Sequence, residues 1–199
     1  MENNLTLRSA NRLEAHLKKN AHEFTKDDIK QVVSDLNIRM INFMYPAGDG
    51  RLKTLNFMLH SPEYLETILT SGERVDGSSL FSFIAAASSD LYVMPRFSTA
   101  FIDPFSEIPT LCMLCSFFDR DGKPLASSPE HTLCKAMAAF KKVTGMEFHA
   151  MGELEYYVIR DDEGVFPADD QHGYHESSPF SKGNDFRMRA MQLIAECGG

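Results

Sequence analysis

The chain has 199 residues, of which 43% are hydrophobic and 24% are charged, a composition typical of a folded globular protein with one domain and room for part of another. Its formal net charge of −8 argues against a nucleic-acid partner, which would need a basic surface stripe, but is compatible with sites that recruit divalent cations. No apolar run approaches the ~20 residues of a membrane helix and the N-terminus lacks a signal-peptide pattern, so we expect no membrane partner and a cytoplasmic location.

The first part of the chain predicts a helix followed by a β-hairpin. Residues 1–24 are polar and are expected to form an N-terminal arm. Thr25 and the acid Asp28 have the pattern of a helix N-terminus, and apolar residues follow them at helical spacing. Alternating apolar and polar residues then predict strands over 38–45 and 52–59, joined by a glycine-containing turn.

A second helix is predicted directly after this hairpin. Ser61 is a suitable N-cap, Pro62 fits the first helical turn, and Gly72 is a typical helix end. Helix, hairpin, helix and later strands in this order fit a small α+β domain, which we expect to span residues 25–125.

The rest of the chain alternates loops with regular elements. Residues 73–109 mix Gly, Ser and Pro with apolar residues and are interpreted as loops that carry fixed acids and hydroxyls. A strand is predicted over 110–118 and helices over 128–145 and 185–197. The part from 126 to 199 is expected to begin a further domain.

Two cysteines in the predicted strand 110–118 have a spacing that also occurs in metal and redox sites. Cys112 and Cys115 are three residues apart, so on a strand they point to opposite faces. There is no second pair of this kind and no clustered histidine in the sequence. We therefore interpret them as small core residues.

An acidic run near the middle of the second part carries the clearest chemical signal. Residues 147–159 alternate like a strand, which places Glu153 and Glu155 on one face, with backbones roughly 6.5 to 7 Å apart. Carboxylates that share a face repel one another, and hard cations such as Mg²⁺ or Mn²⁺ offset that repulsion. Because short Glu-x-Glu runs are common, the spacing alone favours a solvated face on a half-buried strand over a metal site.

Several short motifs follow one another in a fixed order along the chain. They are Val75-Asp76-Gly77-Ser78-Ser79, Ser89-Asp90, Met94-Pro95, Ser98 to Phe105, Glu153-Leu154-Glu155-Tyr156-Tyr157, Gly173-Tyr174 and Asp185-Phe186-Arg187. Together they resemble the N-terminal signature of the glutamine synthetases over about residues 25–199.

This resemblance implies a β-grasp N-terminal domain followed by a glutamine-synthetase-type catalytic α/β domain, of which this chain would hold only a truncated beginning. It further implies two Mg²⁺ or Mn²⁺ ions, ATP, glutamate and ammonia as cofactors and substrates, and a homo-oligomeric ring with active sites between subunits. The family's reaction phosphorylates the side-chain carboxylate of glutamate and replaces the phosphate by ammonia.

The resemblance also implies roles for individual residues. Glu153 and Glu155 would each ligate one metal ion, which agrees with their predicted common face. Asp76 would enter the neighbouring subunit's site and take a proton from ammonium. Ser79 and Tyr174 would help to form the ammonium site.

Departures from the family pattern leave alternatives open. Gly152 stands where a proline usually precedes the first glutamate, and Arg96 stands where an acid is common. A γ-glutamyl ligase acting on another amine and a non-catalytic β-grasp assembly module are therefore the alternatives. Because family members continue for hundreds of residues, we expect this chain to be a piece of such an enzyme, inactive by itself.

Overall fold

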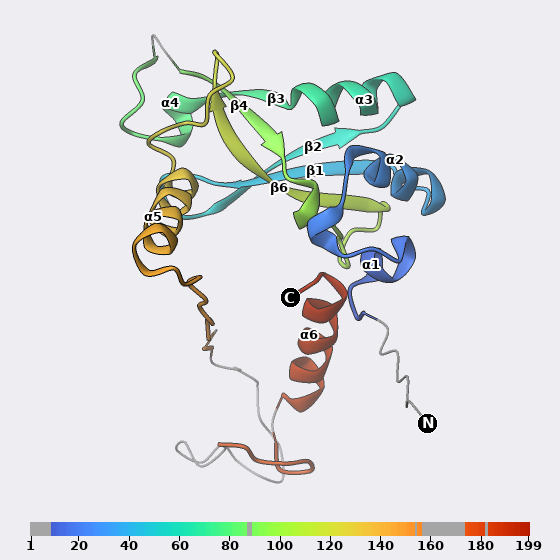
Figure 1. The fold of residues 1–199 in the computed structure, drawn as a ribbon. Helices are drawn as coiled ribbons and strands as arrows, with labels where there is room; N and C mark the ends of the chain where they lie inside the picture. Colours follow the sequence, from blue (N-terminus) through green and yellow to red (C-terminus); the bar gives the residue numbers. More distant parts are fainter. Residues whose placement is uncertain (1–8, 87–88, 154, 157–173, 182) are drawn as a thin grey trace, which may run out of the picture.

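The computed structural model describes residues 9–86, 89–153, 155–156, 174–181 and 183–199 (Figure 1). Within these ranges, a mixed six-stranded sheet has helices packed on one face, and two longer helices extend from it. The expected α+β fold is confirmed.

The helical elements are α1 (Arg12–Leu17), η1 (Ala21–Glu23), α2 (Lys26–Asp35), α3 (Pro62–Ser71), α4 (Gly77–Leu80), η3 (Phe97–Thr99), α5 (Pro129–Thr144) and α6 (Asn184–Glu196). The strands are β1 (Met40–Pro46), β2 (Leu52–Met58), β3 (Glu73–Asp76), β4 (Asp90–Pro95), β5 (Phe101–Ile102) and β6 (Thr110–Asp119).

The predicted hairpin forms one edge of the sheet. β1 and β2 pair antiparallel from Met40 opposite Met58 to Pro46 opposite Leu52. The strand order is β2-β1-β6-β4-β3, with β1 and β6 parallel and β5 pairing with β6 outside this path. Because β6 lies in the middle of the sheet, it joins the hairpin to the strands that follow α3.

Helices α2 and α3 begin where the sequence predicts, and α3 also ends there. Thr25 and Asp28 form a reciprocal capping box at the start of α2. Ser61 accepts a hydrogen bond from the Tyr64 N–H at the start of α3, and Gly72 ends that helix with a φ of 65°. Capping therefore satisfies backbone N–H groups at the start of both helices.

One face of the sheet makes the core. The odd-numbered residues of β1 and β6, from Ile41 to Tyr45 and from Leu111 to Phe117, are buried against the apolar faces of α2 and α3. Cys115 belongs to this core, whereas Cys112 points to the second face and is also buried, as the alternation predicts.

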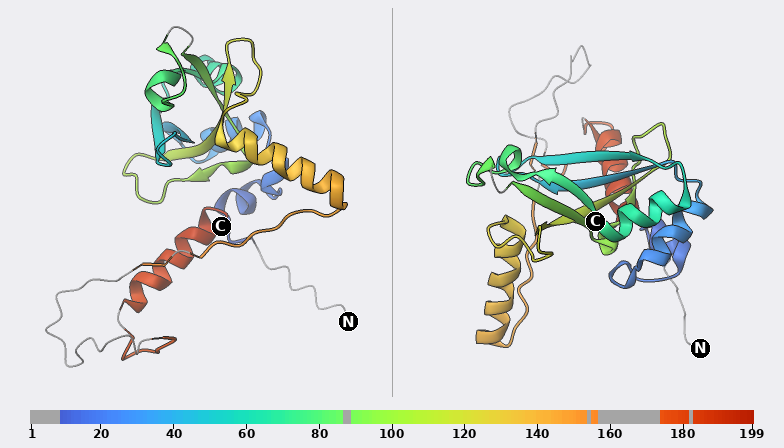
Figure 2. Two further views of the ribbon diagram at one scale, coloured as in Figure 1. Left: turned by 90° about the vertical axis from the view of Figure 1, so that its left-hand side faces the viewer. Right: turned by 90° about the horizontal axis from the view of Figure 1, so that it is seen from above.

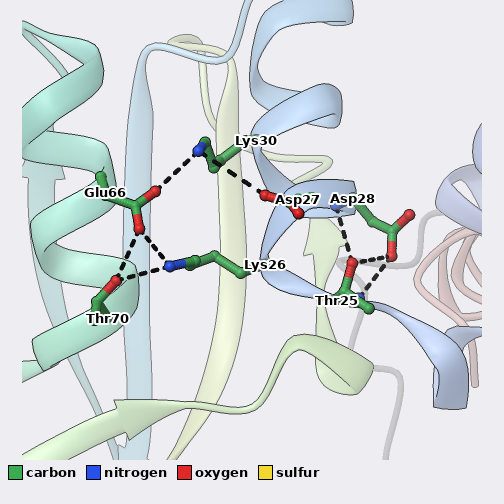
Figure 3. Close-up of polar contacts among 7 residues, drawn as sticks. All are labelled: Thr25, Lys26, Asp27, Asp28, Lys30, Glu66 and Thr70. Atoms are coloured by element: carbon green, nitrogen blue, oxygen red, sulfur yellow. Dashed lines mark hydrogen bonds and ion pairs between the residues drawn. The ribbon is translucent and has the colours of Figure 1, made fainter.

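A polar network joins α2 to α3 above this core (Figure 3). Lys26 and Lys30 of α2 both donate to the carboxylate of Glu66 on α3, Lys30 at 2.9 Å, and Thr70 also contacts it. Lys26 first and then Lys30 lower the pKa of Glu66 to about 2. The network lies near the surface, so it orients the two helices more than it stabilises them.

The interpretation of residues 73–109 as loops is wrong in part. This segment contains β3, β4 and β5, and Leu91 and Val93 of β4 are core residues. The strands are short and separated by Gly, Ser and Pro, so no long alternating pattern marks them. β3 pairs with β4, and both β4 and β5 pair with β6, so the hydrogen bonds of these strands come from other segments of the chain.

The described part of the expected N-terminal arm packs on the domain. Leu13 of α1 is 1% exposed and belongs to the same core as the sheet. His16 of α1 lies 3.0 Å from the carboxylate of Asp35 at the end of α2. The boundary at residue 24 stays a prediction, while residues 9–24 contact the neighbouring domain.

Helices α5 and α6 extend away from the sheet on different sides (Figure 2). α5 starts at Pro129 after the Ser128 cap and ends at Gly145, as predicted, but no residue of α5 is buried. α6 buries Leu193, and its C-terminal end approaches the sheet while its N-terminal end points away (Figure 1). None of the helices in the described ranges combines the length and the apolar character needed to cross a bilayer.

Candidate functional site

The most ordered part of the predicted site is the turn at Asp76. Asp76 ends β3 and caps α4, with its Oδ1 accepting hydrogen bonds from the N–H of Ser78 at 3.0 Å and its hydroxyl at 2.7 Å. The Ser79 hydroxyl donates to Oδ2 at 2.7 Å. The predicted neighbours Asp76 and Ser79 therefore contact each other directly.

The backbone around this turn is fixed by close packing. The Gly77 N–H donates to the Ser89 carbonyl at 2.7 Å. A Cβ on Gly77 would lie 2.7 Å from the Leu91 side chain and 3.0 Å from the Ser89 carbonyl oxygen. The close approach of β3 to β4 thus requires a glycine directly after Asp76.

The Asp76 carboxylate is exposed and ionised. Hydrogen bonds from Ser79, then Ser78 and Ser89, hold the pKa of Asp76 well below its ordinary value. Such a carboxylate attracts a cation, and it is a weak base as long as all these donors remain in place. An ammonium ion bound there would also favour the charged form of the carboxylate, because a neighbouring positive charge stabilises the anion.

A shallow acidic cleft adjoins this turn. Its volume is about 540 Å³, and it is lined by Ser89 and Asp90 on one side and by Asp119 to Asp121 on the other. Asp90 also accepts a hydrogen bond from Arg74 of the neighbouring strand at 3.1 Å. Asp90 therefore braces β3 against β4 next to the Asp76 turn.

The structure places the two predicted metal ligands outside any strand. Residues 147–153 and 155–156 have no strand assignment, so the prediction of a strand is wrong for these residues. A strand requires a hydrogen-bonding neighbour, and in the described part of the chain no strand pairs with this run. Residues 157–159 of that prediction lie outside the described residues.

Glu153 and Glu155 are consequently exposed, and their common face stays a prediction. In the described residues no group of three or more His, Cys, Asp or Glu side chains is arranged to hold a metal ion. Carboxylates are the right ligands for Mg²⁺ or Mn²⁺, but two of them are too few to fill the coordination sphere of either ion.

Tyr174 is 86% exposed and stacks on His175, with ring centroids 4.0 Å apart. Its segment, residues 174–181, lies at the lower end of the molecule in Figure 1, far from α4 at the upper end. The structure thus brings Asp76 and Ser79 together and leaves Glu153, Glu155 and Tyr174 apart from them.

Sequence reasoning missed a further polar group that links α5 to the sheet. Glu130, in the first turn of α5, accepts a hydrogen bond from Ser116 at 2.7 Å and lies 3.2 Å from Arg96. Arg96 is the residue that departs from the family pattern, and an acid in the same position would repel Glu130. The arginine at this position was therefore the one sequence feature that could have indicated its contact with Glu130.

The comparisons with known proteins agree with this architecture. Residues 37–120 match the family model of the glutamine synthetase β-grasp domain. The glutamine synthetase of Methanococcus voltae is 26% identical over 169 residues, which cover 81% of this chain and 38% of that protein. The glutamine synthetase of Staphylococcus epidermidis is 26% identical over 180 residues, which cover 88% of this chain and 40% of that protein.

Solved structures support the fold. The structure of Plasmodium falciparum glutamine synthetase superposes with a TM-score of 0.52 and 15% identity, over 60% of this chain and 23% of that one. A GmaS–ADP complex superposes with a TM-score of 0.50 and 12% identity, over 57% of this chain and 25% of that one.

The fold and the family match define an α+β protein with a β-grasp domain of the glutamine synthetase type. Residues 37–120 match the family model of that domain, and the chain spans 38–40% of the length of the curated relatives it matches.

Proposed function

We propose that this chain supplies the N-terminal part of a cytoplasmic glutamate–ammonia ligase, which amidates glutamate with ATP through γ-glutamyl phosphate. The observation that carries the proposal is the Asp76 turn, in which three hydroxyl groups and a backbone N–H keep an exposed carboxylate ionised. Asp76 attracts ammonium and accepts its proton, and Ser79 orients the carboxylate.

The site is shared between two copies of the chain in an oligomeric ring. Asp76 and Ser79 are exposed at one end of the domain, and the segments of Glu153, Glu155 and Tyr174 lie elsewhere in the same chain. This separation is what a site needs if one subunit contributes the ammonium carboxylate and its neighbour contributes the metal ligands and Tyr174.

Glu153 and Glu155 hold Mg²⁺ or Mn²⁺ together with ligands from outside the described residues. Ions held there would supply positive charge to neutralise phosphate during phosphoryl transfer. The two glutamates are free to rearrange when those further ligands pack on them, because they are exposed and not fixed in a sheet. Alone they bind Mn²⁺ only weakly, which titration with the metal checks.

We expect the 199-residue chain alone to make no glutamine, because it spans only 38–40% of the length of the curated relatives it matches. The test is ATP-dependent glutamine formation by the protein that carries these residues together with the rest of a catalytic domain. Asp76→Asn is expected to lower activity with ammonia by at least about a hundredfold, as removal of a general base does. Asp49→Asn, on the exposed hairpin turn, is the control and should keep activity.

Amine specificity is the second point of the proposal. Phosphate release from ATP with glutamate is measured in the presence of ammonia and, separately, of polyamines. Stimulation by ammonia alone supports a glutamine synthetase. Stimulation by a polyamine alone supports a γ-glutamyl ligase for that amine, and stimulation by neither supports an assembly module.

A further inference from the structure

A large apolar cleft in the described part of the chain lies away from the Asp76 turn. It has a volume of about 750 Å³ and separates the second face of the sheet from the C-terminal half of α6. Met44, Leu52 and Leu114 of three strands form one wall, and Leu193 and Ile194 of α6 form the other. Its size is that of a small-molecule site.

A single charged side chain, that of Asp103, lines this apolar cleft among the described residues. Its backbone is held by a hydrogen bond from the Asp103 N–H to the Thr110 carbonyl at 3.0 Å. Its Oδ1 accepts from the Phe105 N–H at 2.9 Å. The carboxylate is therefore held after β5 by a local hydrogen bond to one of its two oxygens.

The negative charge of Asp103 acts on both walls of the cleft. Burial raises the pKa of Cys112 to about 11, and Asp103 adds to that effect. Burial also raises the pKa of Cys197 on the opposite wall, and Asp103 contributes there as well. The carboxylate is thus close to thiols of β6 and of the end of α6, both of which line the cleft.

We propose that this cleft binds a primary alkylamine of medium length, with its ammonium group on Asp103 and its alkyl chain between the sheet and α6. An apolar wall with one acidic side chain and no basic side chain among its described lining residues favours a cation with an apolar body. A fatty acid of equal length is repelled by the same carboxylate. An alcohol of equal length gains the apolar contacts but not the ion pair.

Binding in the cleft can be measured by the alkylation of two cysteines that lie on different parts of the chain. Cys197 lines the cleft, whereas Cys134 is exposed on α5. The 199-residue chain is alkylated with iodoacetamide in the presence of n-octylamine, n-octanol or octanoate, and labelling of each cysteine is followed by mass spectrometry. Octylamine is expected to slow labelling of Cys197 at concentrations about tenfold below those at which octanol does so, and to leave Cys134 unchanged.

Two variants separate the contribution of charge from that of shape. Asp103→Asn keeps an acceptor for the Phe105 N–H and should make octylamine and octanol equally protective. Asp121→Asn, in the exposed turn after β6, removes the same charge elsewhere and should behave like the wild type. Thr54→Phe, at a lining position of β2, should abolish protection by every ligand.

Equal protection by octylamine and octanol in the wild type would overturn the proposal, as would identical behaviour of Asp103→Asn and Asp121→Asn. Protection by none of the ligands would overturn it too. A second copy of the chain in the cleft would be seen as protection of Cys197 that rises with protein concentration without amine, together with dimers in light scattering. That result would assign the cleft to self-association and also overturn the amine site.

Discussion

At the scale of single residues, Asp28 shows how one side chain serves several groups. Its Oδ2 accepts hydrogen bonds from the Thr25 N–H at 2.6 Å, from the Thr25 hydroxyl at 2.6 Å and from Lys19 at 2.7 Å. The Lys19 bond first and the Thr25 bonds next lower the pKa of Asp28 to about 2. The start of α2 and the preceding segment therefore depend on the same carboxylate.

The first prediction concerns acid stability. Because the pKa of Asp28 is lower in the folded chain than in the unfolded one, its contribution is complete above about pH 4 and is lost as the pH falls towards 2. Asp28→Asn should cost about 1 kcal/mol at pH 7 and less at pH 2.5, measured by urea unfolding. Asp27→Asn, which leaves the capping box intact, is the control. Equal losses at both pH values would contradict this account of Asp28.

The second prediction concerns Gly72, whose φ of 65° and ψ of −156° are accessible almost only to glycine. A Cβ there would lie 2.4 Å from the Val93 carbonyl oxygen. Gly72→Ala should destabilise the chain by about 3 kcal/mol, whereas Gly122→Ala, with φ of 74° and no atom within 4 Å of the added Cβ, should cost about 1 kcal/mol. Denaturation midpoints compare the two, and similar midpoints would show that the clash is relieved.

Residue patterns could predict the Asp76–Ser79 contact but not its electrostatics. Both residues belong to the motif that begins at Val75, and their separation of three positions is typical of a capping turn. The low pKa depends also on Ser89, which β-pairing brings near from the far side of a loop. A contact of that kind has no local signal in the sequence.

At the scale of elements, the attachment of α5 to the sheet depends on few contacts. Glu130 is its described polar link to Ser116 and Arg96, and the body of α5 has no buried residue. This arrangement lets α5 leave the domain in a defined direction without packing on it.

The third prediction tests that link. Glu130→Gln removes the ion pair with Arg96 and should increase amide hydrogen exchange in the first turns of α5, with a loss of about 1 kcal/mol in local stability. Glu147→Gln breaks the exposed pair with Lys141 and should change exchange at the start of α5 very little. Unchanged exchange in both variants would show that Ser128 capping alone fixes the helix.

Elements with local signals were predictable, and elements that depend on distant partners were not. The caps at Thr25, Ser61 and Ser128 gave α2, α3 and α5 with nearly correct ends. The short strands β3 to β5 were missed because they form by pairing with other segments, β3 with β4 and both β4 and β5 with β6. The run around Glu153 alternates well, but alternation alone does not make a strand without a neighbour.

At the scale of the whole molecule, the apolar surface is unevenly distributed. The β-grasp part has a closed core, whereas the exposed large apolar residues concentrate on α5, α6 and the chain between them. Val143 of α5 is 84% exposed, and Leu133 is also exposed. Such patches usually serve as interfaces.

The fourth prediction follows from this distribution. The 199-residue chain should bind a hydrophobic dye and self-associate at micromolar concentration, as measured by fluorescence and light scattering. Replacing Leu133 and Val143 together by Lys should reduce both signals while leaving the unfolding midpoint unchanged, because neither residue is buried. Two Lys replacements at Arg51 and Arg120, both exposed, are the control. An unchanged dye signal in the Leu133 and Val143 variant would show that the dye binds an apolar surface elsewhere on the chain.

The measurement that most directly tests the shared ammonium site uses two inactive variants of the complete protein. Subunits with Asp76→Asn and subunits with Glu153→Ala are denatured together, refolded and assayed for ATP-dependent glutamine formation. If Asp76 serves the neighbouring subunit's metal site, random mixing restores intact sites and up to about a quarter of wild-type activity. A mixture that stays as inactive as each variant alone, despite forming mixed oligomers, would contradict the account.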